Sequence, residues 1–312
     1  MRIVFMGTPE FAVPTLERVV LAGHTVPLVL TQPDRPKGRG GKLAASPVKE
    51  AALRLGLAVW QPERVRRPEV VELLSALRTD AMVVVGYGQI IPQAIIDLPQ
   101  YGIINVHASL LPKYRGAAPL QWAVANGEAV SGVTTMRINA GLDTGDVLLK
   151  HETPIGPEET AVELGARLAV AGADLLVETL SGLEAGTIRP VPQNDAEATL
   201  APILKKEDGL VDWNAPAQAI ANRARGFLPW PGAWTWFRAQ VFHIWKTRAA
   251  ECGDGAPGTL IADRRRLLAQ CGAGTRLEFI EVQQEGRRRM SGEAFLNGLR
   301  PGDNDILGVK ES

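Results

Sequence analysis

Two polar side chains interrupt an apolar run near the middle of the chain. The segment INVHASLLPKYRGAAP places Asn105 and His107 two residues apart, where the apolar run ends before Pro112. Because the side chains of a β-strand alternate between its two faces, Asn105 and His107 would share a face. An amide and an imidazole placed in this way can both donate hydrogen bonds to a substrate. The pair is also compatible with a turn-capping asparagine and a hydrogen-bonded core histidine.

A carboxylate that could join this pair lies in the segment INAGLDTGDVLL. Asp143 stands between Gly141 and Gly145, and apolar runs flank the segment on both sides. Glycines allow a loop backbone to turn sharply and to approach other groups closely. The same segment could be an ordinary turn. At the mouth of one sheet, however, Asp143 could orient His107 and favour its protonated form.

The three side chains together predict stabilisation of an oxyanion. A protonated His107 and the amide of Asn105 could donate hydrogen bonds to a carbonyl oxygen that gains negative charge. No serine or cysteine nucleophile is needed if the attacking group arrives on the substrate. A nicotinamide enzyme is not favoured, because the first apolar run ends in Gly7-Thr8-Pro9 and lacks the GxGxxG fingerprint.

The elements that must position these residues alternate in type. Short apolar runs, which predict strands, lie at residues 3–6, 26–31, 58–61, 81–85 and 103–106. Helical patterns separate them; Ser46 before Pro47 is a good helix start, and Gly56 a good helix end. Such alternation predicts a Rossmann-like α/β fold, a mostly parallel sheet with helices on both faces. Ligands of such sheets bind at the carboxyl ends of the strands, where Asn105 and His107 are predicted to lie.

The alternating pattern continues into the middle of the chain and changes in its last third. Two further strands are predicted at residues 133–138 and 147–149, and a long helix at 159–183. A stretch rich in proline and polar residues follows, and then one helix and a series of short alternating strands. We therefore expect a catalytic domain at residues 1–187, an extended linker at 188–206 and a small β-barrel domain at 207–312.

The composition indicates a globular protein of the cytoplasm. The 312 residues are 46% hydrophobic and 22% charged, with 34 basic and 34 acidic side chains. Zero net charge argues against a surface coated with nucleic acid, but it permits a local basic patch. Cys252 and Cys271, the only cysteines, lack metal-ligand spacing and are expected to be reduced thiols. No apolar run is long enough to cross a membrane, and the first residues do not have the pattern of a signal peptide.

The motif Asn105-x-His107-x-Ser109-Leu110-Leu111-Pro112, followed by KYRGAAP, resembles the signature of the folate-dependent formyltransferases. The resemblance also covers FMGTPEFAVPTL, GLDTGD and PWPGAW. It implies formyl transfer from 10-formyltetrahydrofolate to an amine, without a metal, with Asn105, His107 and Asp143 as the catalytic residues. It implies an apolar folate slot, for which the candidates are Tyr87, Gly88, Ile91, Ser109, Leu110, Leu111, Pro112, Gly141 and Leu142.

A basic loop narrows the resemblance to the members of that family that formylate methionyl-tRNA. It contains the candidate tRNA-binding residues Arg35, Lys37, Arg39, Lys42 and Lys49, with Asp34 as its single acid. Lysine and arginine side chains could neutralise phosphates of the acceptor stem. The loop could instead be merely solvated. In relatives the GRG of this loop is commonly followed by two lysines, and Gly41 replaces one of them here. The C-terminal unit resembles the family's oligonucleotide-binding (OB)-like barrel and would contribute to tRNA binding. We expect initiator methionyl-tRNA as the partner of a monomeric enzyme.

Three alternatives remain open on the sequence alone. A sugar-nucleotide N-formyltransferase would use the same folate donor, but a small acceptor does not need five basic residues in one loop. A formyltetrahydrofolate hydrolase would use water as the acceptor. An RNA-binding module built on the barrel and the loop would leave Asn105, His107 and Asp143 unexplained.

Overall fold

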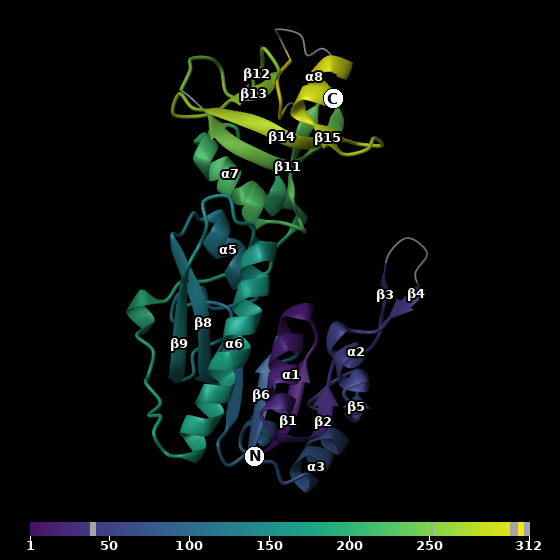
Figure 1. Ribbon diagram of the computed structural model, residues 1–312, viewed down its shortest axis with the longest axis vertical. Helices are drawn as coiled ribbons and strands as arrows, with labels where there is room; N and C mark the ends of the chain where they lie inside the picture. The colour runs from purple at the N-terminus through teal and green to yellow at the C-terminus, as the bar shows by residue number, and fades with distance from the viewer. Residues whose placement is uncertain (38–41, 251, 300–304, 309–312) are drawn as a thin grey trace. The chain divides into compact units, whose positions relative to one another are not determined.

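The chain folds into two compact units, each assembled from separate stretches of sequence (Figure 1). The structure is a computed structural model that describes residues 1–37, 42–250, 252–299 and 305–308. Unit 1 comprises Met1–Gly116, Val130–Pro154 and Gly165–Ala201, and unit 2 comprises Ala117–Ala129, Ile155–Leu164 and Pro202–Ser312.

Unit 1 is built on a seven-stranded sheet. Its strands are β1 (Arg2–Gly7), β2 (Thr25–Leu30), β5 (Val59–Trp60), β6 (Ala81–Val85), β7 (Ile103–His107), β8 (Val130–Arg137) and β9 (Val147–Pro154). They lie in the order β5-β2-β1-β6-β7-β8-β9. The first five are parallel, whereas β8 is antiparallel to both of its neighbours. The predicted Rossmann-like, mostly parallel sheet is confirmed.

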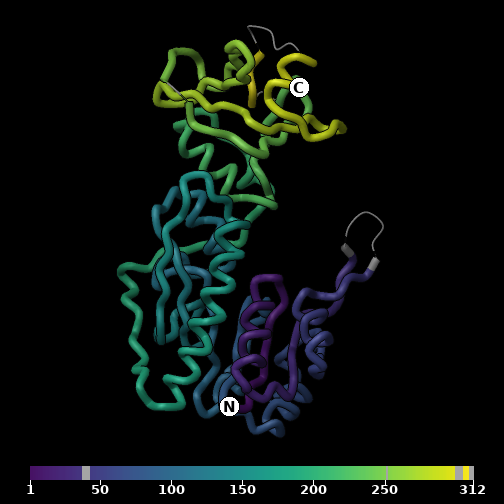
Figure 2. Tube along the Cα trace, in the orientation of Figure 1, coloured from purple at the N-terminus to yellow at the C-terminus, as the bar shows by residue number. Residues whose placement is uncertain are grey.

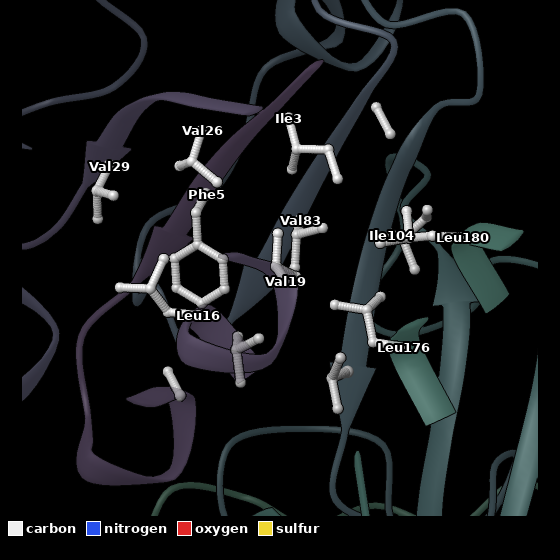
Figure 3. Close-up of a cluster of buried hydrophobic side chains, with 14 of the residues drawn as sticks. Ile3, Phe5, Leu16, Val19, Val26, Val29, Val83, Ile104, Leu176 and Leu180 are labelled. Carbon is white, nitrogen blue, oxygen red and sulfur yellow. The ribbon is translucent and has the colours of Figure 1, made fainter. Parts of the chain in front are cut away.

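Helices cover both faces of this sheet. They are α1 (Val13–Leu21), α2 (Pro47–Arg54), α3 (Pro68–Ala76), α4 (Gln93–Ile96) and α6 (Ala161–Glu184). Alternate residues of β1 serve the two faces: Ile3 and Phe5 pack with α1, α2 and α6, and Val4 and Met6 with α3 and α4. Figure 3 shows Phe5 among apolar side chains of the first face. Full burial of each such large side chain contributes about 1.5–3 kcal/mol.

The local signals for α2 act as the sequence predicts. Ser46 lies just before the helix, and its side chain accepts a hydrogen bond from the Lys49 backbone N–H at 3.1 Å. Pro47 occupies the first turn, where its missing N–H has no role in the helix. The helix ends at Arg54, and Gly56 follows with a φ of 69°. The predicted start and end of this helix are confirmed.

Two short paired strands within the basic loop form a hairpin that the sequence does not predict. Strands β3 (Arg35–Lys37) and β4 (Lys42–Ala44) pair antiparallel after the end of β2. Short, charged, proline-containing strands lack the apolar alternation by which strands are recognised, which explains the omission.

The segment that follows α6 returns along the sheet beside β9 (Figure 2). It is extended apart from two short 3-10 turns, η2 (Asp195–Glu197) and η3 (Lys206–Gly209). Val191 pairs with Val147 of β9 through two backbone hydrogen bonds of 2.8 and 2.9 Å. Further hydrogen bonds tie residues 193–201 to the loops at residues 114–115 and 143–145, so this part of the predicted linker is anchored.

Unit 2 contains an antiparallel sheet of six strands, consistent with the predicted small barrel. The strands are β10 (Ala233–Phe237), β11 (Gln240–Ala250), β12 (Leu260–Asp263), β13 (Arg266–Gln270), β14 (Arg276–Gln284) and β15 (Met290–Ser291). The helices α5 (Pro119–Ala125), α7 (Ala217–Gly226) and α8 (Gly292–Leu299) complete the unit. Phe237, Phe242, Phe279 and Phe295 form an aromatic cluster in its core.

Candidate active site

Asn105 and His107 lie at the carboxyl end of β7 and are nearly buried. They share the face opposite to Ile104 and Val106, which pack in the same cluster as α6. Asn105 is 9% exposed and His107 is 6% exposed. Among the residues that the structure describes, none forms a hydrogen bond with the Asn105 side-chain amide. The amide is therefore available to a ligand at this end of the sheet.

Both ring nitrogens of His107 face a polar partner. Nε2 lies 2.9 Å from the Tyr114 carbonyl oxygen, which can only accept, so Nε2 carries a hydrogen. Nδ1 lies 3.7 Å from Asp143 Oδ2. This second distance is too long for a hydrogen bond, but it places the carboxylate within reach of an imidazolium charge. Asp143 Oδ2 also accepts a hydrogen bond of 2.9 Å from the Gly116 N–H.

The two residues that supply these partners have an unusual backbone conformation. Tyr114 has a φ of 61° and Asp143 a φ of 51°. Left-handed conformations of this kind cost about 1–3 kcal/mol each in non-glycine residues and persist only where the surrounding structure holds them. Gly145, next to them, approaches a neighbouring strand so closely that an added Cβ would lie 1.8 Å from the Arg137 carbonyl oxygen.

The SLLP turn after β7 is held by internal hydrogen bonds. Ser109 is buried; its hydroxyl donates to the Lys113 carbonyl at 2.6 Å, and its own carbonyl accepts from the Thr134 hydroxyl at 2.6 Å. The Leu111 side chain is fully buried, whereas Leu110 and Pro112 are partly exposed. Ser109 and Leu111 thus shape the turn. Leu110 and Pro112 are the two predicted folate contacts of this turn that expose surface.

The other predicted folate contacts also include both buried and exposed residues. Tyr87 and Ile91 are buried in the core beneath β6, and burial raises the pKa of the Tyr87 hydroxyl to about 12. The Tyr87 carbonyl accepts hydrogen bonds of 3.1 Å from Thr8 and Gln32, which fixes the turn at Gly88. By contrast Gly141 is exposed, and Leu142 is 65% exposed.

The basic loop is anchored at its base by Asp34. Lys49 Nζ lies 2.6 Å from Asp34 Oδ2, and Gln61 donates to Oδ1 at 2.7 Å. The hydrogen bond from Lys49 is the main reason why the pKa of Asp34 is lowered. Arg35 is exposed on β3. Arg39 lies outside the described residues, as do the side chains of Lys37 and Lys42.

Sequence reasoning missed two residues beside this site. Arg115, within the KYRG motif, is 7% exposed and donates from Nε and Nη2 to Gln193 Oε1 at 3.0 and 2.9 Å. Gln193 in turn donates to the carbonyl oxygens of Asp143 and Gly145 at 2.8 and 2.7 Å. The sequence signal for Arg115 is its place in the KYRGAAP stretch, and a charged side chain buried in this way requires partners. No local pattern marks Gln193.

Two kinds of feature are missing from the described part of the chain. Within residues 1–37, 42–250, 252–299 and 305–308, no three His, Cys, Asp or Glu side chains gather so as to hold a metal ion. Within the same ranges, no helix combines the length and the apolar character needed to cross a membrane.

Comparison with known proteins identifies relatives over the whole chain. The formyl transferase family matches residues 1–180, and the formyl transferase C-terminal domain matches residues 203–300. A protein of Solibacter usitatus (strain Ellin6076) named methionyl-tRNA formyltransferase is 65% identical over 99% of both chains. A protein of Koribacter versatilis (strain Ellin345) with the same name is 60% identical, again over 99% of both chains.

A solved structure has the same fold at low sequence identity. It is the crystal structure of WlaRD, described as a sugar 3N-formyl transferase in the presence of dTDP and 5-N-formyl-THF. The TM-score is 0.67 at 19% identity, covering 92% of this chain and 99% of that one. At this identity the likeness concerns the fold alone.

Proposed function

The chain belongs to the formyl transferase family, and we propose that it transfers a formyl group from 10-formyltetrahydrofolate to the free amino group of methionyl-initiator tRNA. The observation that carries the proposal is the 65% identity, over nearly the whole of both chains, to a protein named methionyl-tRNA formyltransferase. A folate-derived donor also agrees with the formylated folate named in the WlaRD structure. Such a reaction belongs to translation initiation in the cytoplasm.

The three residues at the sheet edge have complementary roles in this proposal. The methionyl amine attacks the formyl carbon. The oxygen of the formyl group gains negative charge as the new C–N bond forms. The Asn105 amide, which has no other partner among the described residues, donates a hydrogen bond to that oxygen. Because Nε2 donates to the Tyr114 carbonyl, His107 uses Nδ1 to donate a hydrogen bond to the same formyl oxygen.

Asp143 has two roles in the same scheme, one toward His107 and one toward the attacking amine. Its carboxylate lies 3.7 Å from His107 Nδ1, where it stabilises the positive ring. It also helps to remove a proton from the attacking amine, directly or through water. The bond between the formyl carbon and N10 of the folate then breaks, N10 takes up a proton, and tetrahydrofolate leaves. No step of this scheme uses a metal ion.

We propose contacts for both substrates. For folate they are the predicted set Tyr87, Gly88, Ile91, Ser109, Leu110, Leu111, Pro112, Gly141 and Leu142. The buried members, among them Tyr87 and Leu111, shape the slot through their backbone, and the exposed Leu142 offers apolar side-chain surface. For tRNA the contacts are Arg35, Lys37, Arg39, Lys42 and Lys49, with residues 207–312 as a supporting barrel domain joined through residues 188–206 to a catalytic domain at 1–187. The enzyme acts as a monomer.

Acceptor specificity tests this proposal against its rivals. The protein is mixed with 10-formyltetrahydrofolate and, in parallel, with methionyl-initiator tRNA, an amino-sugar nucleotide or no acceptor. We expect the highest kcat/KM with the tRNA. A higher kcat/KM with the amino sugar would favour the sugar-nucleotide enzyme, and rapid release of formate without an acceptor would favour the hydrolase.

Arg35 provides a test of the basic loop. Its side chain is exposed, and no carboxylate neutralises it among the described residues. Arg35→Ala should raise the KM for methionyl-tRNA, leave the KM for folate unchanged and reduce the log–log salt slope of tRNA binding by about one. Arg39→Ala should behave in the same way, whereas Lys49→Ala should change the slope less because Asp34 already neutralises Lys49.

The matched control is Arg66→Ala, which removes another exposed arginine of unit 1, from the segment before α3. Equal salt slopes for the wild type, Arg35→Ala and Arg39→Ala would mean that the loop is only solvated.

A further inference from the structure

The anchored segment at residues 191–201, called the strap below, connects the two loops that carry the candidate catalytic groups. At one end Val191 pairs with Val147, just beyond the loop of Asp143. At the other end the Ala201 N–H donates to the Arg115 carbonyl at 2.7 Å, and the Arg115 N–H donates to the Thr199 carbonyl at 2.9 Å. The strap therefore holds residues 112–116 and 143–147 at a fixed separation.

Within the strap, Gln193 is bonded to both loops at once. Its amide nitrogen uses both hydrogens, on the Asp143 and Gly145 carbonyl oxygens at 2.8 and 2.7 Å. Its amide oxygen accepts two hydrogen bonds from the guanidinium of the buried Arg115. The same Nη2 of that guanidinium also donates to Asp195 Oδ1 at 2.8 Å. The amide group of Gln193 is thus fully occupied in joining the loops.

Thr199 performs the matching task for Tyr114. Its hydroxyl oxygen accepts a hydrogen bond of 2.8 Å from the Tyr114 N–H. Tyr114 and Asp143 are the two left-handed residues of the site, and each supplies an oxygen that faces one ring nitrogen of His107. The strap holds both residues at their backbone, one through Thr199 and the other through Gln193. The environment of His107 on both sides therefore depends on this segment.

We propose that Gln193 and Thr199 are positioning residues for formyl transfer, Gln193 acting through Asp143 and Thr199 through Tyr114. In the part of the chain that the structure describes, neither side chain forms a hydrogen bond with the ring of His107. Each fixes a strained backbone conformation that would otherwise relax and displace an oxygen from the ring. The inference rests on the proposed function, since it assigns these residues to the same reaction.

Gln193→Glu is the most informative variant because it separates the hydrogen bonds that the side chain donates from those that it accepts. The carboxylate still accepts from Arg115, but it cannot donate, and it repels the carbonyl oxygens of Asp143 and Gly145. We expect kcat to fall by ~10- to 100-fold, the usual result of a small displacement of a catalytic group, with both KM values within threefold. The control is Asn194→Ala: this neighbouring side chain is exposed, and its hydrogen bonds to described residues are with Ala196 and Glu197 of the strap, so kcat should be unchanged.

Thr199 allows a rescue experiment. Thr199→Val keeps the shape of the side chain and removes the acceptor for the Tyr114 N–H, so kcat should fall. Thr199→Ser retains the hydroxyl and should restore kcat to within about twofold of wild type. Equal kcat values for the two variants would overturn the role of Thr199.

Coupling to Asp143 separates positioning from a general loss of stability. If Gln193 acts through Asp143, Gln193→Glu should lower kcat by less than threefold in an Asp143→Asn background, although it lowers kcat by ~10- to 100-fold alone. A role confined to stability would give the same fold-loss in both backgrounds, and that result would overturn the proposal.

Hydrogen exchange tests the strap independently of activity. In the full-length protein without substrates, amide exchange in residues 141–147 and at Gly116 should be faster in Gln193→Glu than in wild type and unchanged in Asn194→Ala. Failure of the wild type to formylate methionyl-tRNA would reject the proposed function while this exchange result still supported the strap. Unchanged exchange in Gln193→Glu, with unchanged kcat, would reject the strap alone.

Discussion

Replacing His107 with alanine is expected to lower kcat for formyl transfer by ~100- to 1000-fold, the usual loss when one donor to a developing oxyanion is removed. The affinity for methionyl-tRNA should stay within about threefold of wild type, because the ring acts on the transition state. The ring is also nearly buried at the end of β7, with 6% of its surface exposed. Single-turnover rates with saturating folate and tRNA measure the chemical step directly.

Two further variants make this result specific to His107. His151→Ala removes the exposed histidine of β9 in the same unit and should leave kcat unchanged. His107→Gln keeps a hydrogen-bond donor near the Tyr114 carbonyl. It therefore controls for a loss of activity that is caused only by misfolding. A His107→Ala variant with kcat within threefold of wild type would exclude the ring from the mechanism.

Asp143→Asn is expected to lower kcat by ~100- to 10,000-fold, the range for loss of a positioned acid–base group. The amide oxygen of asparagine can still accept from the Gly116 N–H, so the loop keeps its shape, but no anion then faces His107 Nδ1 at 3.7 Å. The loss therefore reports the charge and not the fold. Thermal unfolding should be close to that of wild type.

The matched control for this variant lies three residues further along the same loop. Asp146→Asn removes an equal charge from the GLDTGD segment, whereas the ion pair of His107 is with Asp143, so this variant should change kcat by less than twofold. If Asp143→Asn behaved like Asp146→Asn, Asp143 would be only a turn residue.

The sequence predicts the fold well where the signals are local. Continuous apolar runs locate the strands of unit 1, and Ser46 with Pro47 locates the start of α2, because burial and capping act within a few residues. The period of a strand is also enough to place Asn105 and His107 on one face. Asp143 is brought within 3.7 Å of His107 by the sheet, as the sequence expectation required.

The parts that could not be predicted depend on contacts between distant segments. Gln193 bonds to backbone carbonyls 48 and 50 residues away, and Thr199 to a backbone N–H 85 residues away. Backbone groups are the same in every residue, so no side-chain pattern announces such a partner. For the same reason the sequence did not show that residues 117–129 and 155–164 belong to unit 2.

Transfer of a formyl group to methionyl-tRNA can be tested by following the formyl carbon. The full-length protein is incubated with methionyl-initiator tRNA and 10-formyltetrahydrofolate labelled in the formyl group, and the aminoacyl ester is then hydrolysed and analysed by mass spectrometry. We predict that the label is recovered on the amino nitrogen of methionine, in an amount equal to the tetrahydrofolate formed. Recovery of the label as free formate, with methionine unmodified, would exclude formyl transfer to methionyl-tRNA.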